Sequence, residues 1–361
     1  MNDLGIYLHW PYCKSKCPYC DFFSVVKRNV NQDEIIDGYL RQLEQYKNLL
    51  GDRHIKSVFF GGGTPSLIKP ENITKILTKI DELWGLPSTA EISLEANPNT
   101  NKQDMFASLH RAGINRLSLG VQSLDDTELK FLGRTHNSNQ ALQAIDEVLS
   151  NFANHSIDLM YALPDQNIAG WQKQLEKICN FGFKHLSLYQ LTIEEGTVFA
   201  RKNVKPLDEE QAAELYQFTT RFLTSQGYNR YEVSNYANLG YECVHNQIYW
   251  QGGDYIGIGT SAHGRLRHNN KIYAQTDNLQ LEELTSRERA AELIIMGLRL
   301  AAGINISDVK NYCGLDFAKY VNDDFKQQMI AQGLLQEDKL FLRASKQGFL
   351  VLDYLIEGLV P

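Results

Sequence analysis

Residues 13–20 read Cys13-Lys14-Ser15-Lys16-Cys17-Pro18-Tyr19-Cys20, and this stretch decides how the rest of the chain is interpreted. Three thiolates on one short loop, at the spacing CxxxCxxC, can bind three irons of a 4Fe-4S cluster. The fourth iron then stays open to a small molecule. In a reducing compartment, such a tight group of cysteines is typical of metal binding rather than of disulfides. We therefore expect Cys13, Cys17 and Cys20 to hold a 4Fe-4S cluster.

The open iron of such a cluster can be chelated by the amino and carboxylate groups of S-adenosylmethionine. One electron from the cluster then cleaves the sulfonium bond and gives a deoxyadenosyl radical, so that the protein has only to position the two groups. The alternative is a structural zinc site with His9 or a distant residue as its fourth ligand. Structural zinc sites usually pair two short ligand hooks, and the sequence has no second one, which favours the cluster.

Around this loop, the first two hundred residues alternate β-rich runs with amphipathic helical stretches. Apolar side chains recur every three to four residues between Ile35 and Leu50 and predict one buried helix face. Further helices are expected near residues 71–84, 101–112, 138–151, 170–180 and 208–226. Strands that alternate with helices predict right-handed βαβ units, and so an α/β fold, a partial (β/α)6 parallel barrel. The six expected strands are residues 5–9, 57–60, 91–94, 116–119, 157–160 and 185–189.

The residues with chemical potential follow the ends of these strands. Cys13 follows the first strand, and the glycine-rich run Gly61-Gly62-Gly63-Thr64-Pro65 follows the second. Glu95, Gln122 and Asp158 lie on or just beyond the third, fourth and fifth. In α/β barrels, the loops at the carboxyl ends of the strands build the active site, so these residues should converge on one mouth. The glycine run would let the backbone approach the methionine part of the cofactor closely.

The remainder of the chain predicts a second, smaller unit. A stretch rich in Tyr and Gly, residues 228–264, leads to a unit that begins near Ser286. Helices near 287–300 and 316–332, a hairpin at 335–340 and a last helix at 346–358 suggest a winged-helix-like module. It lacks a basic stripe, which favours packing or partner binding over DNA binding. The expected domains are a core over residues 1–227, a connecting region over 228–285 and a C-terminal domain over 286–361.

Composition excludes several classes of function. A net charge of −7 and a pI near 5.8 argue against a nucleic-acid partner, because such binding relies on clustered Lys and Arg. No apolar run approaches the ~18 residues that span a bilayer, and the apolar run 349–355 is expected to be core rather than a membrane anchor. The start of the chain has no secretory pattern, so the cytoplasm is the expected compartment. Cys179, Cys243 and Cys313 are expected to be buried thiols without chemistry.

Several motifs together resemble the radical S-adenosylmethionine family, and within it the oxygen-independent coproporphyrinogen III oxidase-like proteins. The resemblance runs nearly end to end. Its motifs are Tyr7, residues 13–22, residues 61–66, Leu119-Gly120-Val121-Gln122-Ser123 and Leu132-Gly133-Arg134-Thr135-His136. Within that family, the run His245-Asn246-Gln247-Ile248-Tyr249-Trp250 is similar to the HNxxYW motif of the heme chaperone branch.

The resemblance implies a role for each matching residue. It implies a 4Fe-4S cluster on the three cysteines of the loop and heme binding through His245. A neutral imidazole is a good axial ligand, and Tyr249 and Trp250 offer flat apolar surface for a porphyrin. Cys243 is the second candidate ligand, since thiolates also bind heme iron. The implied contacts to S-adenosylmethionine are Tyr7, Tyr19, Gly62, Gly63, Thr64, Glu95, Gln122, Arg134 and Asp158.

The implied function is that of a heme chaperone, which binds heme and passes it to apo-hemoproteins. Membrane-bound respiratory enzymes are candidate acceptors, so the protein would act in the cytoplasm or at the membrane periphery, and a homodimer fits this role. The cluster and S-adenosylmethionine would support cluster integrity, dimerisation or regulation. The runner-up is the oxidase, which decarboxylates coproporphyrinogen III by radical chemistry. The motif typical of that branch is CxxxCxxCxC, whereas here Asp21 and Phe22 follow Cys20. That branch also carries an N-terminal extension ahead of the cluster loop, whereas here only twelve residues precede Cys13.

Overall fold

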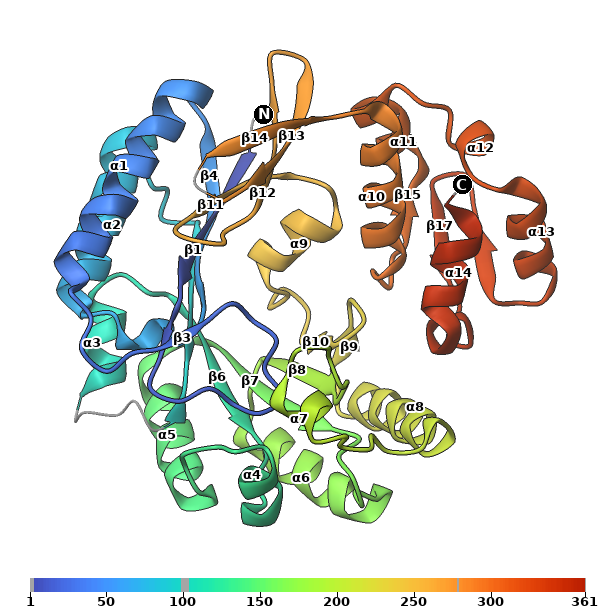
Figure 1. The fold of residues 1–361 in the computed structure, drawn as a ribbon. Helices are drawn as coiled ribbons and strands as arrows, with labels where there is room; N and C mark the ends of the chain where they lie inside the picture. Colours follow the sequence, from blue (N-terminus) through green and yellow to red (C-terminus); the bar gives the residue numbers. More distant parts are fainter. Residues whose placement is uncertain (1–2, 99–103, 278, 361) are drawn as a thin grey trace.

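The computed structural model describes residues 3–98, 104–277 and 279–360 (Figure 1). Its centre is a set of six parallel strands that neighbour each other in chain order, and each contains one of the six predicted runs. The set comprises β1 (Asp3–Trp10), β4 (His54–Gly62), β5 (Glu91–Ala96), β6 (Arg116–Gln122), β7 (Asn154–Tyr161) and β8 (His185–Gln190). The prediction of six βα units is therefore confirmed.

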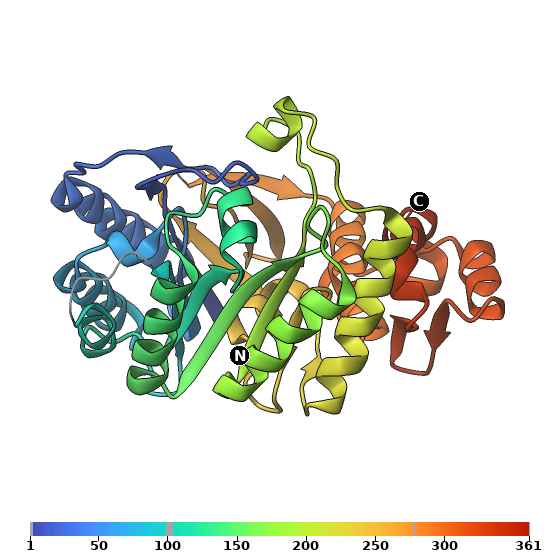
Figure 2. The same cartoon turned by 90° about the horizontal axis from the view of Figure 1, so that it is seen from below.

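The predicted helices cover the outer face of this curved sheet (Figure 2). In α1, the buried side chains Ile36, Tyr39, Leu43, Tyr46 and Leu50 form the predicted stripe and join the main core. The first part of the predicted helix 101–112, residues 101–103, lies outside the described residues. The predicted helices are α1 (Gln32–Leu50), α2 (Pro70–Trp84), α3 (Met105–Arg111), α5 (Ser138–Asn151), α6 (Ile168–Phe181) and α8 (Glu209–Ser225). Two short helices that were not predicted, α4 (Asp126–Phe131) and α7 (Val198–Arg201), occur between them.

The sheet stays open, as a partial barrel requires. Its order runs from β14 through β13, β12 and β11 to β1, across the six parallel strands, and ends at β10 and β9. The region expected to connect two domains thus contributes six short strands to the main sheet, of which β11 pairs parallel with β1. These strands are β9 (Asn229–Arg230), β10 (Asn235–Ala237), β11 (Asp254–Ile258), β12 (Gly264–His268), β13 (Lys271–Thr276) and β14 (Gln280–Leu284).

The inner face of the open barrel carries polar side chains at two levels. Side chains of a strand alternate between its faces, so Glu91 and Glu95 of β5 share the inner face, one near each end of the strand. Helix α9 (Val244–Trp250), which holds the HNxxYW run, packs against β4 and β11 at the level of Glu91 (Figure 1). The carboxyl ends of the strands, where Glu95 lies, and the amino ends, where α9 packs beside Glu91, are therefore two levels of one interior.

The C-terminal region has a hydrophobic core of its own. The predicted hairpin forms a three-stranded sheet with one strand that was not predicted, β15. In the apolar run 349–355, Phe349, Leu352 and Leu355 are buried in this core, as expected, while Leu350, Val351 and Tyr354 are exposed. In the described part of the chain, no helix is both long and apolar enough to cross a membrane. The elements are α10 (Ser286–Leu298), β15 (Ile304–Asn305), α11 (Ile306–Cys313), α12 (Phe317–Tyr320), α13 (Asp323–Ala331), β16 (Leu335–Glu337), β17 (Phe341–Ala344) and α14 (Leu352–Leu359).

Candidate functional site

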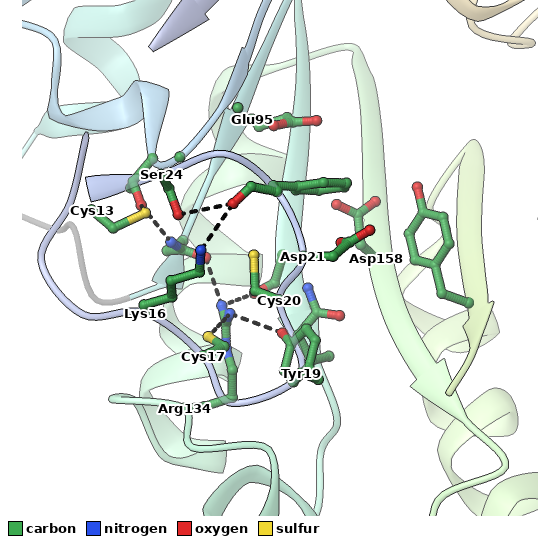
Figure 3. A pocket seen from close by; sticks show the side chains of 18 of the residues that line it. Cys13, Lys16, Cys17, Tyr19, Cys20, Asp21, Ser24, Glu95, Arg134 and Asp158 are labelled. Carbon is green, nitrogen blue, oxygen red and sulfur yellow. Dashed lines mark hydrogen bonds between the residues drawn. The ribbon is translucent and has the colours of Figure 1, made fainter. Parts of the chain in front are cut away.

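A cavity of about 350 Å³ opens at the carboxyl ends of the parallel strands, beside the cysteine loop (Figure 3). Elements far apart in the sequence converge on it, as the strand-end argument predicts. All three predicted cluster ligands and eight of the nine predicted cofactor residues line it. They are Cys13, Cys17, Tyr19, Cys20, Gly62, Gly63, Thr64, Glu95, Gln122, Arg134 and Asp158.

Backbone hydrogen bonds fold the cysteine loop so that its thiols reach this cavity. The two-residue strand β2 (Tyr12–Cys13) pairs with β3 (Val25–Val26) and closes the base of the loop. At its tip, the N–H of Cys20 donates to the carbonyl of Cys17 at 3.1 Å in a tight turn. The carbonyl of Pro18 accepts from the N–H of Phe199 at 3.0 Å, which attaches the tip to helix α7.

The donors around the sulfurs fit an iron-sulfur cluster. The hydroxyl of Thr64 donates to the sulfur of Cys13 at 3.5 Å, and Arg134 Nη1 donates to the sulfur of Cys17 at 3.3 Å. Such donors stabilise thiolate ligands and tune a cluster. Burial raises the pKa of the Cys20 thiol, so this sulfur needs a metal to stay ionised. Within the described residues, no three His, Cys, Asp or Glu side chains meet closely enough to hold a single metal ion.

The glycine run lies directly on the cysteine loop. The N–H of Gly63 donates to the carbonyl of Trp10 at 2.7 Å, and the N–H of Thr64 donates to the carbonyl of Tyr12 at 3.0 Å. A Cβ on Gly63 would lie 2.8 Å from the carbonyl oxygen of Tyr12, and Gly62 has a φ of +106°. Only glycine tolerates both conditions. The sequence predicted a close approach of the glycine backbone to the cofactor. In the structure, this backbone closely approaches the neighbouring cysteine loop.

Arg134 joins three parts of the cavity wall. Its Nη1 donates to the sulfur of Cys17 and, at 3.3 Å, to the hydroxyl of Tyr19. Its Nη2 donates to the Asn97 side-chain oxygen at 2.6 Å and to the carbonyl of Gly120 at 2.7 Å. The guanidinium thus connects the cysteine loop to the ends of β5 and β6. Arginine suits this position because its fork presents several donors in fixed directions.

Two half-buried carboxylates, Glu95 and Asp158, face the cavity from β5 and β7. Burial, and next the charge of Asp158, raise the pKa of Glu95 to about 8. Burial also raises the pKa of Asp158, against the hydroxyl of Ser118, which donates to it at 2.8 Å. At neutral pH, Glu95 is therefore largely protonated while no cation is near. A ligand with a permanent positive charge, such as a sulfonium, would favour the ionised carboxylates.

Comparison with known proteins agrees with this geometry. Residues 7–178 match the radical SAM superfamily, and residues 284–351 match the HemN C-terminal domain. The heme chaperone HemW of Escherichia coli is 34% identical, over 99% of this chain and 98% of its own length. The chain belongs to the HemW family of radical SAM proteins. The HemW of Haemophilus influenzae is 33% identical over the same shares of both chains.

Two further similar proteins carry other names. The mitochondrial radical S-adenosyl methionine domain-containing protein 1 of Mus musculus is 38% identical, over 99% of this chain and 87% of its own. A solved structure of coproporphyrinogen III oxidase (HemN) from Escherichia coli, described as a radical SAM enzyme, superposes with a TM-score of 0.82. It covers 99% of this chain and 89% of the oxidase, at 21% identity, and shows that the two share a fold.

Tyr7 is the one predicted cofactor residue that is not among the described residues lining the cavity. It lies behind Gly61, where its ring stacks on Phe59 with centroids 6.2 Å apart. Its hydroxyl bonds to His9 Nδ1 at 3.0 Å, and His9 Nε2 bonds to the carbonyl of Phe23 at 3.0 Å. Through His9, Tyr7 therefore supports the far end of the cysteine loop.

Sequence reasoning missed several residues that line the cavity. Asn97 follows β5 by one residue and bonds to both Arg134 and Thr64, but an isolated Asn after a strand usually predicts only a turn. Gln122 was predicted, and a shift of register between Gly120 and Gln122 marks a bulge in β6 there. Bulges redirect side chains next to binding sites. The other missed lining residues include Met160, Tyr189, Gln190, Thr192 and Glu194.

His245, the predicted heme ligand of the HemW motif, is fully buried. Its exposed fraction is 0%, its Nδ1 lies 2.7 Å from the hydroxyl of Ser57, and its ring stacks on Phe59 with centroids 5.0 Å apart. Burial lowers the pKa of His245 to about 3, so the imidazole is neutral. Its Nε2 has no hydrogen-bond partner among the described residues. A porphyrin iron can reach this nitrogen only if α9 moves outward.

Cys243, the second candidate ligand, is also buried. Its thiol donates to Glu91 at 3.4 Å, and burial raises the pKa of Cys243 to about 12. It is therefore a neutral thiol, a weaker ligand for heme iron than a thiolate. Cys313 is buried as expected, while Cys179 is half-buried on α6.

Proposed function

We propose that this chain is a heme chaperone, which binds heme and transfers it to apo-hemoproteins. The observation that carries the proposal is the complete HNxxYW run from His245 to Trp250, in a chain whose relatives named heme chaperone HemW match it over nearly its whole length. Apo-hemoproteins, including membrane-bound respiratory enzymes, are the proposed acceptors. We further propose that the protein works in the cytoplasm or at the membrane periphery and as a homodimer.

In this proposal the cavity holds a 4Fe-4S cluster on Cys13, Cys17 and Cys20, with S-adenosylmethionine beside it. When bound, these groups supply one-electron chemistry. The chain's own residues bind and orient them. Thr64 donates a hydrogen bond to the sulfur of Cys13 and Arg134 to that of Cys17, and the backbone of Gly62 and Gly63 would border the cofactor. Tyr7 acts indirectly, through His9.

The two carboxylates have a separate part in this site. Glu95 and Asp158 are the only acidic side chains on the described strands that face the cavity. We propose that these carboxylates interact with the positively charged sulfonium of S-adenosylmethionine. Gln122 and Tyr19 offer an amide and a phenol hydroxyl for the polar groups of its nucleoside part. Two neighbouring carboxylates that are partly removed from water are favourable only when a cation or a proton accompanies them.

Heme would bind through His245 Nε2, after α9 has moved out of the barrel. The bond to Ser57 occupies Nδ1, which leaves Nε2 as the nitrogen with a free position. Because Ser57 lies on β4, this bond fixes the ring only while α9 is packed in the barrel, and it would break as α9 moves out. Tyr249, whose ring meets that of His245 edge to face at 4.8 Å, travels with it and would cover part of the porphyrin.

The oxidase is the second candidate, since its fold is shared. Phe22 argues against the oxidase, because the CxxxCxxCxC motif of the oxidase branch has a further cysteine at this position. This side chain lines the cavity and is 61% exposed. A bulky ring therefore occupies a position where the other branch has a thiol, which favours a different use of the site.

The proposal is tested by heme transfer. Anaerobically reconstituted protein is loaded with heme, freed of excess heme and mixed with an apo-hemoprotein, and the acceptor's absorption spectrum is followed. Transfer should be complete with wild-type protein and fail with His245→Ala. The matched control is His263→Ala, because His263 is exposed and outside the HNxxYW run. Failure of wild-type protein to bind or pass on heme would refute the proposed function.

A further inference from the structure

A buried carboxylate on another element, Glu91, helps to hold the start of helix α9. Glu91 of β5 accepts from the backbone N–H of Val244 at 3.0 Å and of His245 at 3.2 Å, and from the thiol of Cys243 at 3.4 Å. First-turn N–H groups have no partner within a helix, and an acidic group near them is stabilising. Cys243, the residue before the helix, supplies no side-chain cap in the described structure. The position of α9 therefore depends on Glu91.

A chain of hydrogen bonds reaches the same point from the opposite side. The backbone N–H of Cys243 donates to the hydroxyl of Tyr231 at 3.3 Å. That hydroxyl lies 2.8 Å from His185 Nε2, and His185 Nδ1 lies 2.7 Å from the hydroxyl of Ser156. Four residues on separate elements are thus connected, and His185 and Ser156 are buried on the inner face of the sheet.

The other end of this chain is in the cofactor cavity. The hydroxyl of Ser156 lies 3.5 Å from that of Ser187, and Ser187 is the register partner of Asp158 on the neighbouring strand, where its hydroxyl lowers the pKa of that carboxyl. Asp158 lines the cavity that we assign to S-adenosylmethionine. Side chains therefore connect the cavity at the carboxyl ends of the strands to the start of α9 at their amino ends.

The chemistry of the chain gives it a direction. Burial lowers the pKa of His185, so its ring is neutral and has one donor and one acceptor nitrogen. If Tyr231 donates to Nε2, then Nδ1 donates to Ser156, and the serine hydroxyls donate onward to the carboxylate of Asp158. Every donor then has an acceptor, and the chain ends on a negative charge. A cation that binds Asp158 competes for that carboxylate and weakens the bonds along the chain.

We propose that Glu91 and Tyr231 are positioning residues for His245, and that the chain from Tyr231 to Asp158 makes the hold of Tyr231 on α9 depend on the occupant of the cofactor cavity. Binding of S-adenosylmethionine loosens the start of α9 and makes His245 accessible. The link to heme rests on the proposed function. The coupling itself concerns only the cavity and the helix.

Hydrogen exchange measures the hold on α9 without any heme. Amide exchange of residues 243–247 is compared with and without S-adenosylmethionine in anaerobically reconstituted protein. We expect the cofactor to accelerate exchange of this segment about 5-fold or more, a usual size for coupling between sites. Tyr231→Phe should abolish the acceleration. Tyr228→Phe is the matched control, because the buried hydroxyl of Tyr228 donates to the carbonyl of Phe183 at 2.6 Å and lies outside the chain.

Two results would overturn the inference. One is wild-type protein whose exchange in this segment ignores bound cofactor; the other is Tyr231→Phe protein that responds as strongly as Tyr228→Phe. A second variant, Glu91→Gln, should exchange faster even without cofactor. Heme titration of the same samples separates the two proposals: if exchange follows the prediction while heme does not bind, the proposed function fails and the coupling stands.

Discussion

Arg134 Nη1 lies 3.3 Å from the sulfur of Cys17, although 117 positions separate the two residues. The same guanidinium bonds to Asn97 and to the carbonyl of Gly120, so one side chain holds the cysteine loop against the ends of two strands. The arrangement assigns Arg134 a double task, since it supports a cluster ligand and shapes the cofactor cavity.

Replacing Arg134 should therefore impair cofactor binding. We expect Arg134→Gln to weaken S-adenosylmethionine binding by about tenfold or more, because a hydrogen bond to a charged group contributes about 1.5 to 3 kcal/mol. Equilibrium dialysis of reconstituted protein measures the change. The control is Arg111→Gln, since exposed Arg111 bonds to the nearby Ser108. Equal affinities of the two variants would show that Arg134 has no such task.

The metal content tests the cysteine loop. Anaerobically purified protein should contain about four irons per chain and show iron-sulfur absorption, because three thiolates and an open iron make a four-iron cluster. Cys17→Ser should lose both signals. Cys179→Ser, an isolated half-buried cysteine on α6, should keep them. Stoichiometric zinc without iron would refute the cluster and restore the zinc alternative.

The pKa of Glu95 predicts how cofactor affinity depends on pH. Burial and Asp158 raise this pKa to about 8, so below pH 8 a proton must leave before the carboxylate can meet the sulfonium. Affinity should therefore rise with pH up to about 8 and then level off, with a slope of up to about tenfold per unit below that point. Glu95→Gln should flatten the profile between pH 6.5 and 8.5. A wild-type affinity that falls with rising pH would contradict this account.

Much of the cavity at the carboxyl ends of the strands could be predicted from the sequence, because strand periodicity, glycines and cysteine spacing are local signals. The register that brings Asn97 to Arg134 has no such signal. Nor has the burial of His245, which depends on Ser57 and Glu91 on distant strands. A motif indicates which side chain is used, whereas its exposure is decided by tertiary packing. The short strands β12 to β14 were missed because polar residues and Gly interrupt their alternation.

Substrate turnover separates the chaperone from the oxidase. With the cluster reduced and S-adenosylmethionine present, coproporphyrinogen III should remain unconverted. The reason is that Phe22 occupies the position of the last cysteine in the motif of the oxidase branch. Anaerobic incubation followed by chromatography of the porphyrins provides the measurement. Formation of protoporphyrinogen would overturn the choice of function in favour of the oxidase.

Heme titration of His245→Ala tests the central claim most directly. Wild-type protein, His245→Ala and the exposed control His263→Ala are reconstituted in parallel, and heme binding is followed by absorption while iron-sulfur content is assayed in each sample. The account predicts that only His245→Ala loses heme affinity or changes the heme spectrum, and that this variant keeps its cluster. The reason is that His245 lies at the amino ends of the strands, whereas the cysteine loop lies at their carboxyl ends. If His245→Ala binds heme like wild-type protein while Cys243→Ser does not, the thiolate is the ligand; if both bind it unchanged, heme is held elsewhere and the claim is contradicted.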